Sequence, residues 1–474
     1  MSGAAGPTGP TQVPAHPALF WSPWAWLGGR WQAGVCLEAD ASGHWLRITD
    51  NIHQAPAQAT VLQGPVLPGM VNAHSHAFQR AFAGLSERRV SHADDFWSWR
   101  DRMYGVALRI TPAQLRAVAA QLFVEMLQGG YTQVCEFHYL HHSESGAAYA
   151  DPATMAWAVA DAAADAGLGL TMLPVLYERA GFAQQGLRED QRRFAGTPDW
   201  VSELQASVAR SGRALVNAGV AVHSLRAASA AGITKLLARV ADRDMPIHIH
   251  VAEQLQEVHD CLTHTGKRPI QWLCDGLRPD RRWQLVHATH AEAGEIDAVA
   301  RSGAGIVICP STEGNLGDGL ADLQRWLASQ VPMAIGSDSH MCRQWHEELR
   351  WLEYGQRLHL QRRNVAADPT QGHGATAARL FDAALAAGGQ AAGQSHWGLC
   401  AGARADLLVL DTQAPGLLGV PTDHLLDALI FACDRPAIRD VYVAGRRMVT
   451  EGRHVQAPAI ARAFGQAMGA LHSA

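Results

Sequence analysis

Lysine is nearly absent from this chain of 474 residues, in which Lys235 and Lys267 are the only two. Arginine therefore carries almost all of the positive charge, and the formal net charge at pH 7 is −5. Proteins that bind nucleic acid or an anionic membrane surface through charge present a basic patch, which this balance does not favour. We therefore expect neither nucleic acid nor a membrane among its partners.

Long hydrophobic runs are also missing. No uninterrupted apolar stretch reaches the roughly 20 residues that a helix needs to span a bilayer. Residues 1–18 are rich in Gly, Ala and Pro, and they lack the basic start and apolar run of a secretory signal. We predict that they form a flexible N-terminal tail and that the protein is soluble and cytoplasmic.

Closely spaced cysteines are the third absence. The eight cysteines are scattered, and no two of them have CxxC spacing. This distribution excludes a zinc ribbon and disfavours a disulfide scaffold. We expect buried free thiols in a reducing compartment.

The middle of the chain alternates between short apolar runs and helical patterns. In one such helical pattern, Pro112–Gln128, Thr111 and Pro112 make a good start and Gly129 a good stop. Strand followed by helix eight times is the pattern of an α/β fold with a (β/α)8 TIM-like barrel, which we predict over residues 64–395. The eight predicted strands are 66–73, 132–137, 170–176, 218–223, 246–251, 284–288, 305–309 and 332–335.

The two ends of the chain do not fit another barrel repeat. Strand-like segments occur at 37–48, 407–410 and 440–449. We predict a second, smaller β-sandwich domain formed from both chain ends, residues 19–63 and 396–455. Residues 456–474 are then a C-terminal helix or tail.

Histidines and a carboxylate stand at the C-terminal ends of the predicted strands, where a barrel of this type builds its site. His74 and His76 lie two apart, so both imidazoles point to the same face of the first strand. His250 ends the fifth run and Asp338 follows the eighth. His248 is a rival ligand, but we prefer His250 because it lies nearer the barrel mouth.

These four residues predict a metal centre. Three neutral imidazoles, one carboxylate and one open position for water suit Zn²⁺, with Fe²⁺ possible. A common dinuclear version of such barrels is bridged by a carbamylated lysine from the fourth strand. The fourth run, 218–223, holds no lysine. We therefore predict one metal ion per subunit.

A metal of this kind lowers the pKa of a bound water to about 7. Asp338 can ligate the metal and accept the proton of this water. Glu253, one turn after His250, is placed to protonate a leaving nitrogen, and His287, which ends the sixth run, can orient the nucleophile and stabilise a tetrahedral intermediate. Alone, Glu253 would be a solvated carboxylate and His287 a core histidine. Their joint position at strand ends favours catalytic roles.

Other histidines lack such a pattern. We expect His92, His264, His359 and His373 to lie at the surface. The adjacent pair His141-His142 would point to opposite faces of a strand, so we leave it out of the site.

The order HxH, HxxE, His and Asp resembles the mononuclear aminohydrolase branch of the amidohydrolase superfamily, over roughly residues 20–455. A barrel flanked by a β-sandwich from both termini is also the architecture of that superfamily. Within the branch, the chain resembles the formimidoylglutamate deiminase family of histidine degradation. The stretches that carry this resemblance are 68–80, 136–139, 223–226, 248–254, 268–273 and 314–319.

The resemblance implies conversion of N-formimino-L-glutamate and water to N-formyl-L-glutamate and ammonia, and a homodimer. A dicarboxylate substrate calls for bidentate guanidinium partners. Arg226, just past the fourth strand, and Arg100, in the loop after the first, are the candidates. Alternatively, residues 96–100 form a helix in which Arg100 is solvated. The substrate-binding residues implied by the family are Gln79, Arg100, Tyr139, His223 and Arg226.

Three other functions stay open at this point. Another mononuclear deaminase of the superfamily, acting on a nucleobase or a related ring, would offer aromatic stacking and amide side chains in place of two arginines. A dinuclear amidase-type hydrolase would need the bridging lysine. A barrel that serves only as a scaffold would have lost ligands, and none is missing here.

Overall fold

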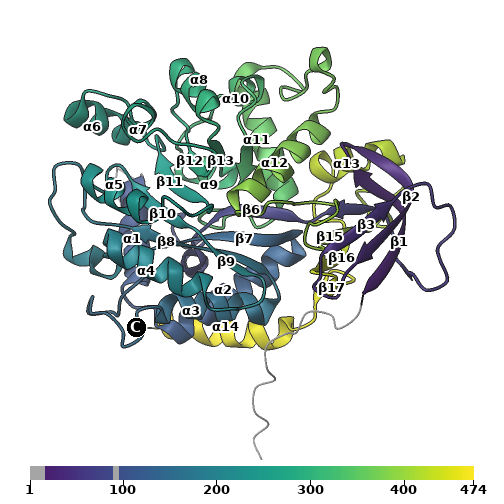
Figure 1. Ribbon diagram of the computed structural model, residues 1–474, viewed down its shortest axis with the longest axis horizontal. Coiled ribbons are helices and arrows are strands. Elements are labelled where there is room, and N and C mark those ends of the chain that lie inside the picture. The colour runs from purple at the N-terminus through teal and green to yellow at the C-terminus, as the bar shows by residue number, and fades with distance from the viewer. Residues whose placement is uncertain (1–16, 89–95, 474) are drawn as a thin grey trace, which may run out of the picture.

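Two sheets organise the protein (Figure 1). The computed structural model describes residues 17–88 and 96–473. An eight-stranded parallel barrel lies beside a separate mixed sheet, which strands from both chain ends build. The predicted fold class is therefore confirmed.

The barrel sheet follows the order of the chain. Its strands pair in parallel, each with the next, and a short strand, β9 (Val216–Ala218), adds to β8 outside this path. The eight strands are β6 (Met70–Ser75), β7 (Tyr131–His138), β8 (Gly169–Leu176), β10 (Val220–Ser224), β11 (Ile247–Val251), β12 (Trp283–His287), β13 (Gly305–Ile308) and β14 (Met333–Ile335).

Helices follow each barrel strand and cover the outside of the barrel (Figure 1). They are α1 (Phe96–Ala107), α2 (Pro112–Gln128), α3 (Thr154–Ala166), α4 (Pro198–Ala209), α5 (Ala230–Arg239), α6 (Leu255–Thr265), α7 (Pro269–Leu277), α8 (Ala293–Ser302), α9 (Pro310–Leu316), α10 (Leu323–Ala328), α11 (Trp345–Leu360) and α12 (Thr376–Ala391).

Local sequence explains where these helices begin and end. In α2 the hydroxyl of Thr111 accepts a hydrogen bond from the amide of Gln114, the side-chain oxygen of Gln114 accepts one from the Thr111 amide, and Pro112 occupies the first turn. This capping box satisfies amide groups that have no partner within the helix. Gly129 ends the helix, as predicted from the sequence.

The first predicted strand, 66–73, is wrong as a single barrel strand. Its first part is β5 (Val66–Pro68), which belongs to the terminal sheet, and its second part is β6 of the barrel. Gly69 separates them. A Cβ atom at this position would lie 2.2 Å from the hydroxyl oxygen of Thr132. Only glycine therefore lets the backbone pass from one sheet to the other at this point.

The terminal sheet joins strands that are distant in sequence. Strand β5 pairs with β1 from the N-terminal part and with β15 from the C-terminal part. The sheet encloses a core of its own, which includes Phe20, Trp45 and Tyr442. Its other strands are β1 (Ala18–Leu27), β2 (Arg30–Ala39), β3 (Trp45–Thr49), β4 (Thr60–Val61), β15 (Leu407–Leu410), β16 (Ile438–Val443), β17 (Arg446–Thr450) and β18 (Arg453–His454).

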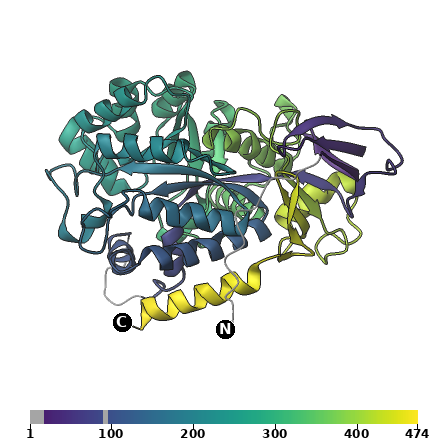
Figure 2. The same ribbon diagram turned by 60° about the horizontal axis from the view of Figure 1, so that its bottom comes forward.

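Two further helices come from the C-terminal part, α13 (Leu425–Phe431) and α14 (Ala457–His472). Helix α14 runs along the barrel against α2 (Figure 2). Across the described residues, no helix combines the length and the apolar character that a membrane span requires.

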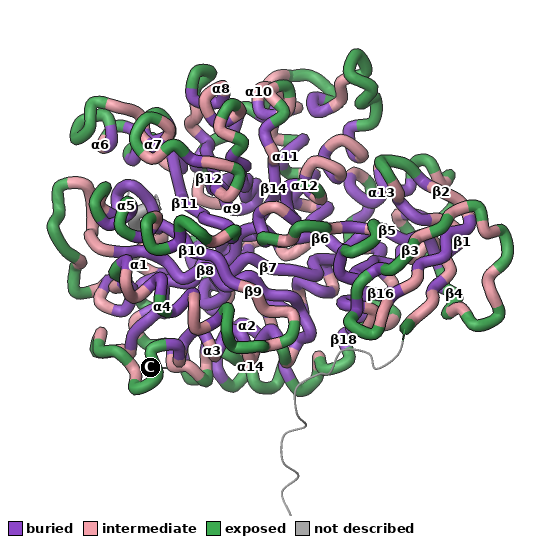
Figure 3. The backbone as a smooth tube through the Cα atoms, in the orientation of Figure 1, coloured by how far each residue is buried: buried purple, intermediate pink, exposed green. Residues whose placement is uncertain are grey.

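Burial follows the two sheets. The barrel strands are buried along their length, whereas exposed residues concentrate on the surrounding helices and loops (Figure 3). The barrel closes where Ser75, at the end of β6, bridges to Asp338, just past β14. This seam brings the first and the eighth barrel strands together at their C-terminal ends.

Candidate active site

Four predicted metal ligands meet at the C-terminal end of the barrel. The Nε2 atom of His74 lies 3.1 Å from Nε2 of His76 and 2.9 Å from Nε2 of His250. The Oδ1 atom of Asp338 lies 3.6 Å from Nε2 of His74 and 3.3 Å from Nε2 of His76. All four side chains are buried.

The second ring nitrogens fix the orientation of two of these imidazoles. Nδ1 of His76 contacts the carbonyl oxygen of Phe137 at 3.1 Å, and Nδ1 of His250 contacts the carbonyl oxygen of His223 at 2.9 Å. A carbonyl can only accept, so both Nδ1 atoms carry the proton and both Nε2 atoms present a lone pair. This is the outer contact that metal-ligating histidines usually make.

Protonation of the cluster is disfavoured. Burial lowers the pKa of His76 to about 3, and burial together with the neighbouring histidines lowers the pKa of His74 and of His250. Neutral imidazole is the form that binds a metal. Ligands of a tetrahedral zinc ion lie about 2.0–2.1 Å from it, and thus roughly 3.3 Å from one another. The observed separations fit a metal of this size.

Backbone strain concentrates at the same strand ends. The φ angles are +46° at Asp338, +70° at His287 and +52° at Ala252, which precedes Glu253. Residues other than glycine rarely adopt this left-handed region, and such strain clusters at functional sites. The fold thus holds three side chains of the site in orientations that an extended strand end would not give them.

His287 joins a group of carboxylates beside the ligand cluster. Its Nε2 atom lies 3.8 Å from Glu253 Oε1 and 3.7 Å from Asp338 Oδ2, and its Nδ1 atom lies 3.2 Å from Glu313 Oε1. Burial alone would lower the pKa of His287, but the negative charges of Glu253, Glu313 and Asp338 raise it to about 10. Burial raises the pKa of Asp338 to about 7, against the opposing effect of His287. The group can therefore hold and exchange protons.

A pocket opens onto this cluster, and all five predicted substrate-binding residues line it: Gln79, Arg100, Tyr139, His223 and Arg226. The side-chain amide of Gln79 donates to the hydroxyl oxygen of Tyr139 at 3.0 Å. Arg226 is almost fully buried. Arg100 lies on helix α1, as in the alternative to the predicted loop, but its side chain lines the pocket.

The two arginines influence each other. Burial, together with the positive charge of Arg226, lowers the pKa of Arg100, while Tyr104 and Tyr177 raise it. Both guanidinium groups line one largely buried pocket. The pocket is therefore suited to a ligand with more than one negative charge.

The remaining histidines named from the sequence stay outside the cluster. His248 contacts the carbonyl oxygen of Ala391 at 2.9 Å, which uses its Nε2 atom. His141 and His142 contact the carbonyl oxygens of Val175 and Ala195, at 3.2 and 2.8 Å. As expected for surface residues, His264, His359 and His373 are exposed. His92 lies outside the described residues.

Sequence reasoning missed several residues of the site. Tyr177 follows the third barrel strand directly, a position that could have marked it. Glu313 lies on α9, after the seventh strand, and contacts His287. The other pocket residues that were not predicted are Trp99, Met103, Tyr104, Phe194 and Leu316.

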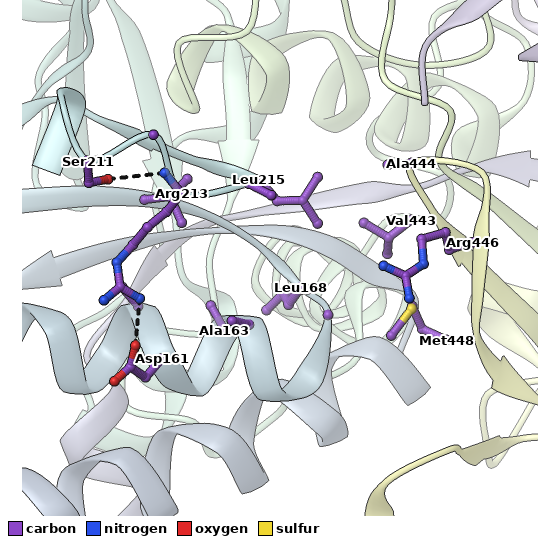
Figure 4. A pocket seen from close by; sticks show the side chains of 16 residues that line it. Asp161, Ala163, Leu168, Ser211, Arg213, Leu215, Val443, Ala444, Arg446 and Met448 are labelled. Atoms are coloured by element: carbon purple, nitrogen blue, oxygen red, sulfur yellow. Dashed lines mark hydrogen bonds and ion pairs between the residues drawn. The ribbon is translucent and has the colours of Figure 1, made fainter. Parts of the chain in front are cut away.

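A larger cavity of about 580 Å³ lies elsewhere, between the barrel and the terminal sheet. Figure 4 shows Arg213 and Asp161, which pair at 2.5 Å, together with apolar side chains such as Leu215 and Val443. None of the residues predicted for catalysis lines this cavity. It adjoins Leu168 and Leu215, which precede β8 and β9, and so it lies at the opposite ends of these strands from the metal ligands.

Comparison with known proteins agrees with this geometry. Residues 66–448 match the model of the amidohydrolase family. The formimidoylglutamate deiminase of Pseudomonas aeruginosa is 47% identical over 446 residues, which cover 93% of this chain and 96% of the relative.

Solved structures show the same fold. The crystal structure of an amidohydrolase from Brucella melitensis has a TM-score of 0.91 and 41% identity, covering 96% of this chain and 99% of the other. An adenosine deaminase from Xanthomonas campestris, solved with bound zinc, has a TM-score of 0.79 at 20% identity, covering 98% and 100% of the two chains. The chain therefore belongs to the amidohydrolase family and, within it, to the family of formimidoylglutamate deiminase.

Proposed function

We propose that this protein hydrolyses N-formimino-L-glutamate to N-formyl-L-glutamate and ammonia, a step in histidine degradation. The observation that carries the proposal is the position of Arg100 and Arg226 in the pocket that opens onto the ligand cluster. This substrate carries two carboxylates and an amidine-like carbon. The arginines suit the carboxylates, and the cluster suits a hydrolytic attack on the carbon.

The four-ligand cluster is proposed to hold one Zn²⁺ ion, with Fe²⁺ as the alternative. When bound, the metal supplies a nucleophile at neutral pH by lowering the pKa of a water. His74, His76, His250 and Asp338 provide the nitrogen and oxygen donors that zinc accepts. The zinc in the related Xanthomonas deaminase supports this choice.

A single metal ion per subunit is supported by the position of both lysines. Lys235 lies on α5 and pairs with Asp199 at 2.8 Å, and Lys267 pairs with Asp275 at 2.7 Å. Both lysine side chains are exposed. Strand β10 offers no lysine that could bridge two ions.

Substrate binding is assigned to the wall of the pocket. Arg226 and Arg100 hold the carboxylates through charged hydrogen bonds, and Gln79, Tyr139 and His223 add neutral ones near the mouth. Water leaves the pocket as the substrate enters, which strengthens each of these interactions. Binding in this way orients the formimino carbon toward the ligand cluster.

Proton transfer is assigned to the carboxylates around His287. Asp338 accepts a proton from the attacking water, and Glu253 and Asp338 together pass both protons of the water to the departing nitrogen, which restores both carboxyl groups. His287 stabilises the charge that develops on the oxygen at the formimino carbon. Ammonia then leaves, and the formyl product remains bound to the arginines until release.

The test is ammonia release by the zinc-loaded protein from N-formimino-L-glutamate, with formimino-L-aspartate and guanine measured beside it. We expect rapid release from the glutamate compound. Activity on guanine alone would be consistent with the metal site but would contradict the assignment of the pocket to a dicarboxylate. The aromatic residues Tyr104 and Tyr177, which also line the pocket, would then be the candidates for stacking on a ring substrate.

A homodimer in the cytoplasm is proposed as the working form. The family resemblance is the basis for the dimer. Helix α11 also exposes an apolar stripe: Trp351 and Leu358 lie two turns apart and are 52% and 82% exposed. All eight cysteines are free thiols, which supports a reducing compartment. Light scattering of the purified protein measures the oligomeric state, and a monomer would contradict the proposed homodimer.

A further inference from the structure

Glu313 is a buried carboxylate that the reaction scheme above does not use. It lies on α9, after the seventh barrel strand, and is 4% exposed. Its Oε1 atom accepts a hydrogen bond from the amide of Cys309 at 2.8 Å and lies 3.2 Å from Nδ1 of His287. One oxygen therefore anchors the start of α9 and contacts the imidazole of the site.

The contact decides which nitrogen of His287 faces the reaction. A carboxylate accepts, so Nδ1 must carry the proton that lies between them. Nε2 is then directed away from α9, and it lies 3.8 Å from Glu253 Oε1 and 3.7 Å from Asp338 Oδ2. Without a partner for Nδ1, the orientation of the ring would not be fixed.

We propose that Glu313 is a positioning residue that accepts a hydrogen bond from Nδ1 of His287 and thereby holds Nε2 toward Glu253 and Asp338. The inference rests on the proposed function in one respect, because catalysis is one of its readouts. His287, Cys309 and Glu313 also lie close enough to hold a metal ion. The hydrogen bonds to Glu313 Oε1 favour the orienting role.

A merely structural role is the competing explanation, because Glu313 also binds the amide of Cys309. Glu348 offers a matched control. It is another fully buried glutamate that holds α9, accepting from the amide of Ser311 at 2.9 Å and from its hydroxyl at 2.6 Å. Burial raises the pKa of Glu348 to about 8, so glutamine at this position resembles the protonated acid present at pH 7.

The first readout is steady-state kinetics of E313A, E313Q and E348Q. We expect kcat of E313A to fall about 10²-fold, with KM within about twofold and unchanged metal content, since Glu313 touches neither the substrate pocket nor the four ligands. E313Q can still accept from both donors and should recover most of the loss. E348Q should match the wild type. A kcat of E313A within threefold of wild type, or a loss that follows metal content or unfolding, overturns the proposal.

The second readout uses no substrate. Nitrogen-15 NMR of histidine-labelled protein, with His287 assigned by its absence in H287N, reports the hydrogen bonding of each ring nitrogen. The Nδ1–H of His287 should give a hydrogen-bonded signal in the wild type and in E313Q, and in E313A this signal should shift toward that of an N–H without this bond. An unchanged His287 signal in E313A contradicts the proposal. Failure of the wild type to release ammonia would instead count against the proposed function, and the NMR result would still decide the role of Glu313.

Discussion

The backbone amide of Asp338 donates a hydrogen bond to the carbonyl oxygen of His74 at 3.0 Å. His74 belongs to the first barrel strand and Asp338 follows the last, and this bond lies in the seam where the barrel closes. The metal centre is thus built across the seam. The side chain of Asp338 reaches the ligand cluster because its own backbone is fastened to the strand that carries His74 and His76.

Asp338→Asn tests the acidic ligand. The amide keeps the shape of the side chain but loses its charge and its ability to accept a proton. We expect weaker metal binding and a loss of kcat by several orders of magnitude. Metal content by elemental analysis and ammonia release on the same sample measure both effects. A variant with full metal content and near-normal turnover would remove Asp338 from the scheme.

Glu253→Gln separates proton transfer from metal binding. Because Glu253 is not one of the four proposed ligands, the variant should keep its metal. Loss of the proton donor should lower kcat by roughly 10²–10⁴-fold and leave KM little changed. Stopped assays for ammonia across substrate concentrations give both constants. If kcat stays within tenfold of wild type, another group protonates the leaving nitrogen.

Arg226→Met tests the recognition of a carboxylate. A hydrogen bond to a charged group contributes about 1.5–3 kcal/mol, so KM should rise roughly 10–150-fold, with a smaller effect on kcat. Arg213→Met is the matched control, because this arginine pairs with Asp161 at the distant cavity. Equal kinetics in the wild type and Arg226→Met would mean that Arg226 does not bind substrate.

Stability should depend on pH through Glu348. Burial raises its pKa in the folded protein from 4.5 to about 8. A carboxyl group with a raised pKa stabilises the fold fully below about pH 4.5, and this contribution is lost as pH rises toward 8, at about 1.4 kcal/mol per pKa unit. Thermal unfolding of the wild type should therefore shift to lower temperature between pH 5 and pH 8.5 by more than that of Glu348→Gln. Parallel curves for the two proteins would show that Glu348 titrates normally.

The barrel could be predicted because each strand is a short apolar run that a helical pattern follows. The ends of those runs also marked the four residues that we propose as metal ligands, since side-chain direction alternates along a strand. The hydrophobic pattern could not show that the chain leaves the terminal sheet for the barrel at Gly69. Nothing in the hydrophobicity of residues 66–73 changes where the chain leaves one sheet for the other, and only the closeness of Thr132 explains the glycine.

The sequence alone could not identify residues whose role depends on tertiary contacts. Glu313 precedes a glycine-containing loop and looks like an ordinary helical glutamate, and its meaning depends on the distance to His287. The sequence left open whether Arg100 lies in a loop or on a helix with a solvated side chain, and its place in the pocket depends on tertiary packing. Tyr104, from the same helix, enters the pocket only because α1 packs over the barrel mouth.

The most direct test of the account is reconstitution of the metal-free protein. A chelator removes the metal, Zn²⁺ is added back in steps, and ammonia release from N-formimino-L-glutamate is measured at each step. The account predicts that activity rises in proportion to zinc and levels off at one ion per chain. Activity in the fully metal-free protein, or a plateau that needs two ions per chain, would contradict it.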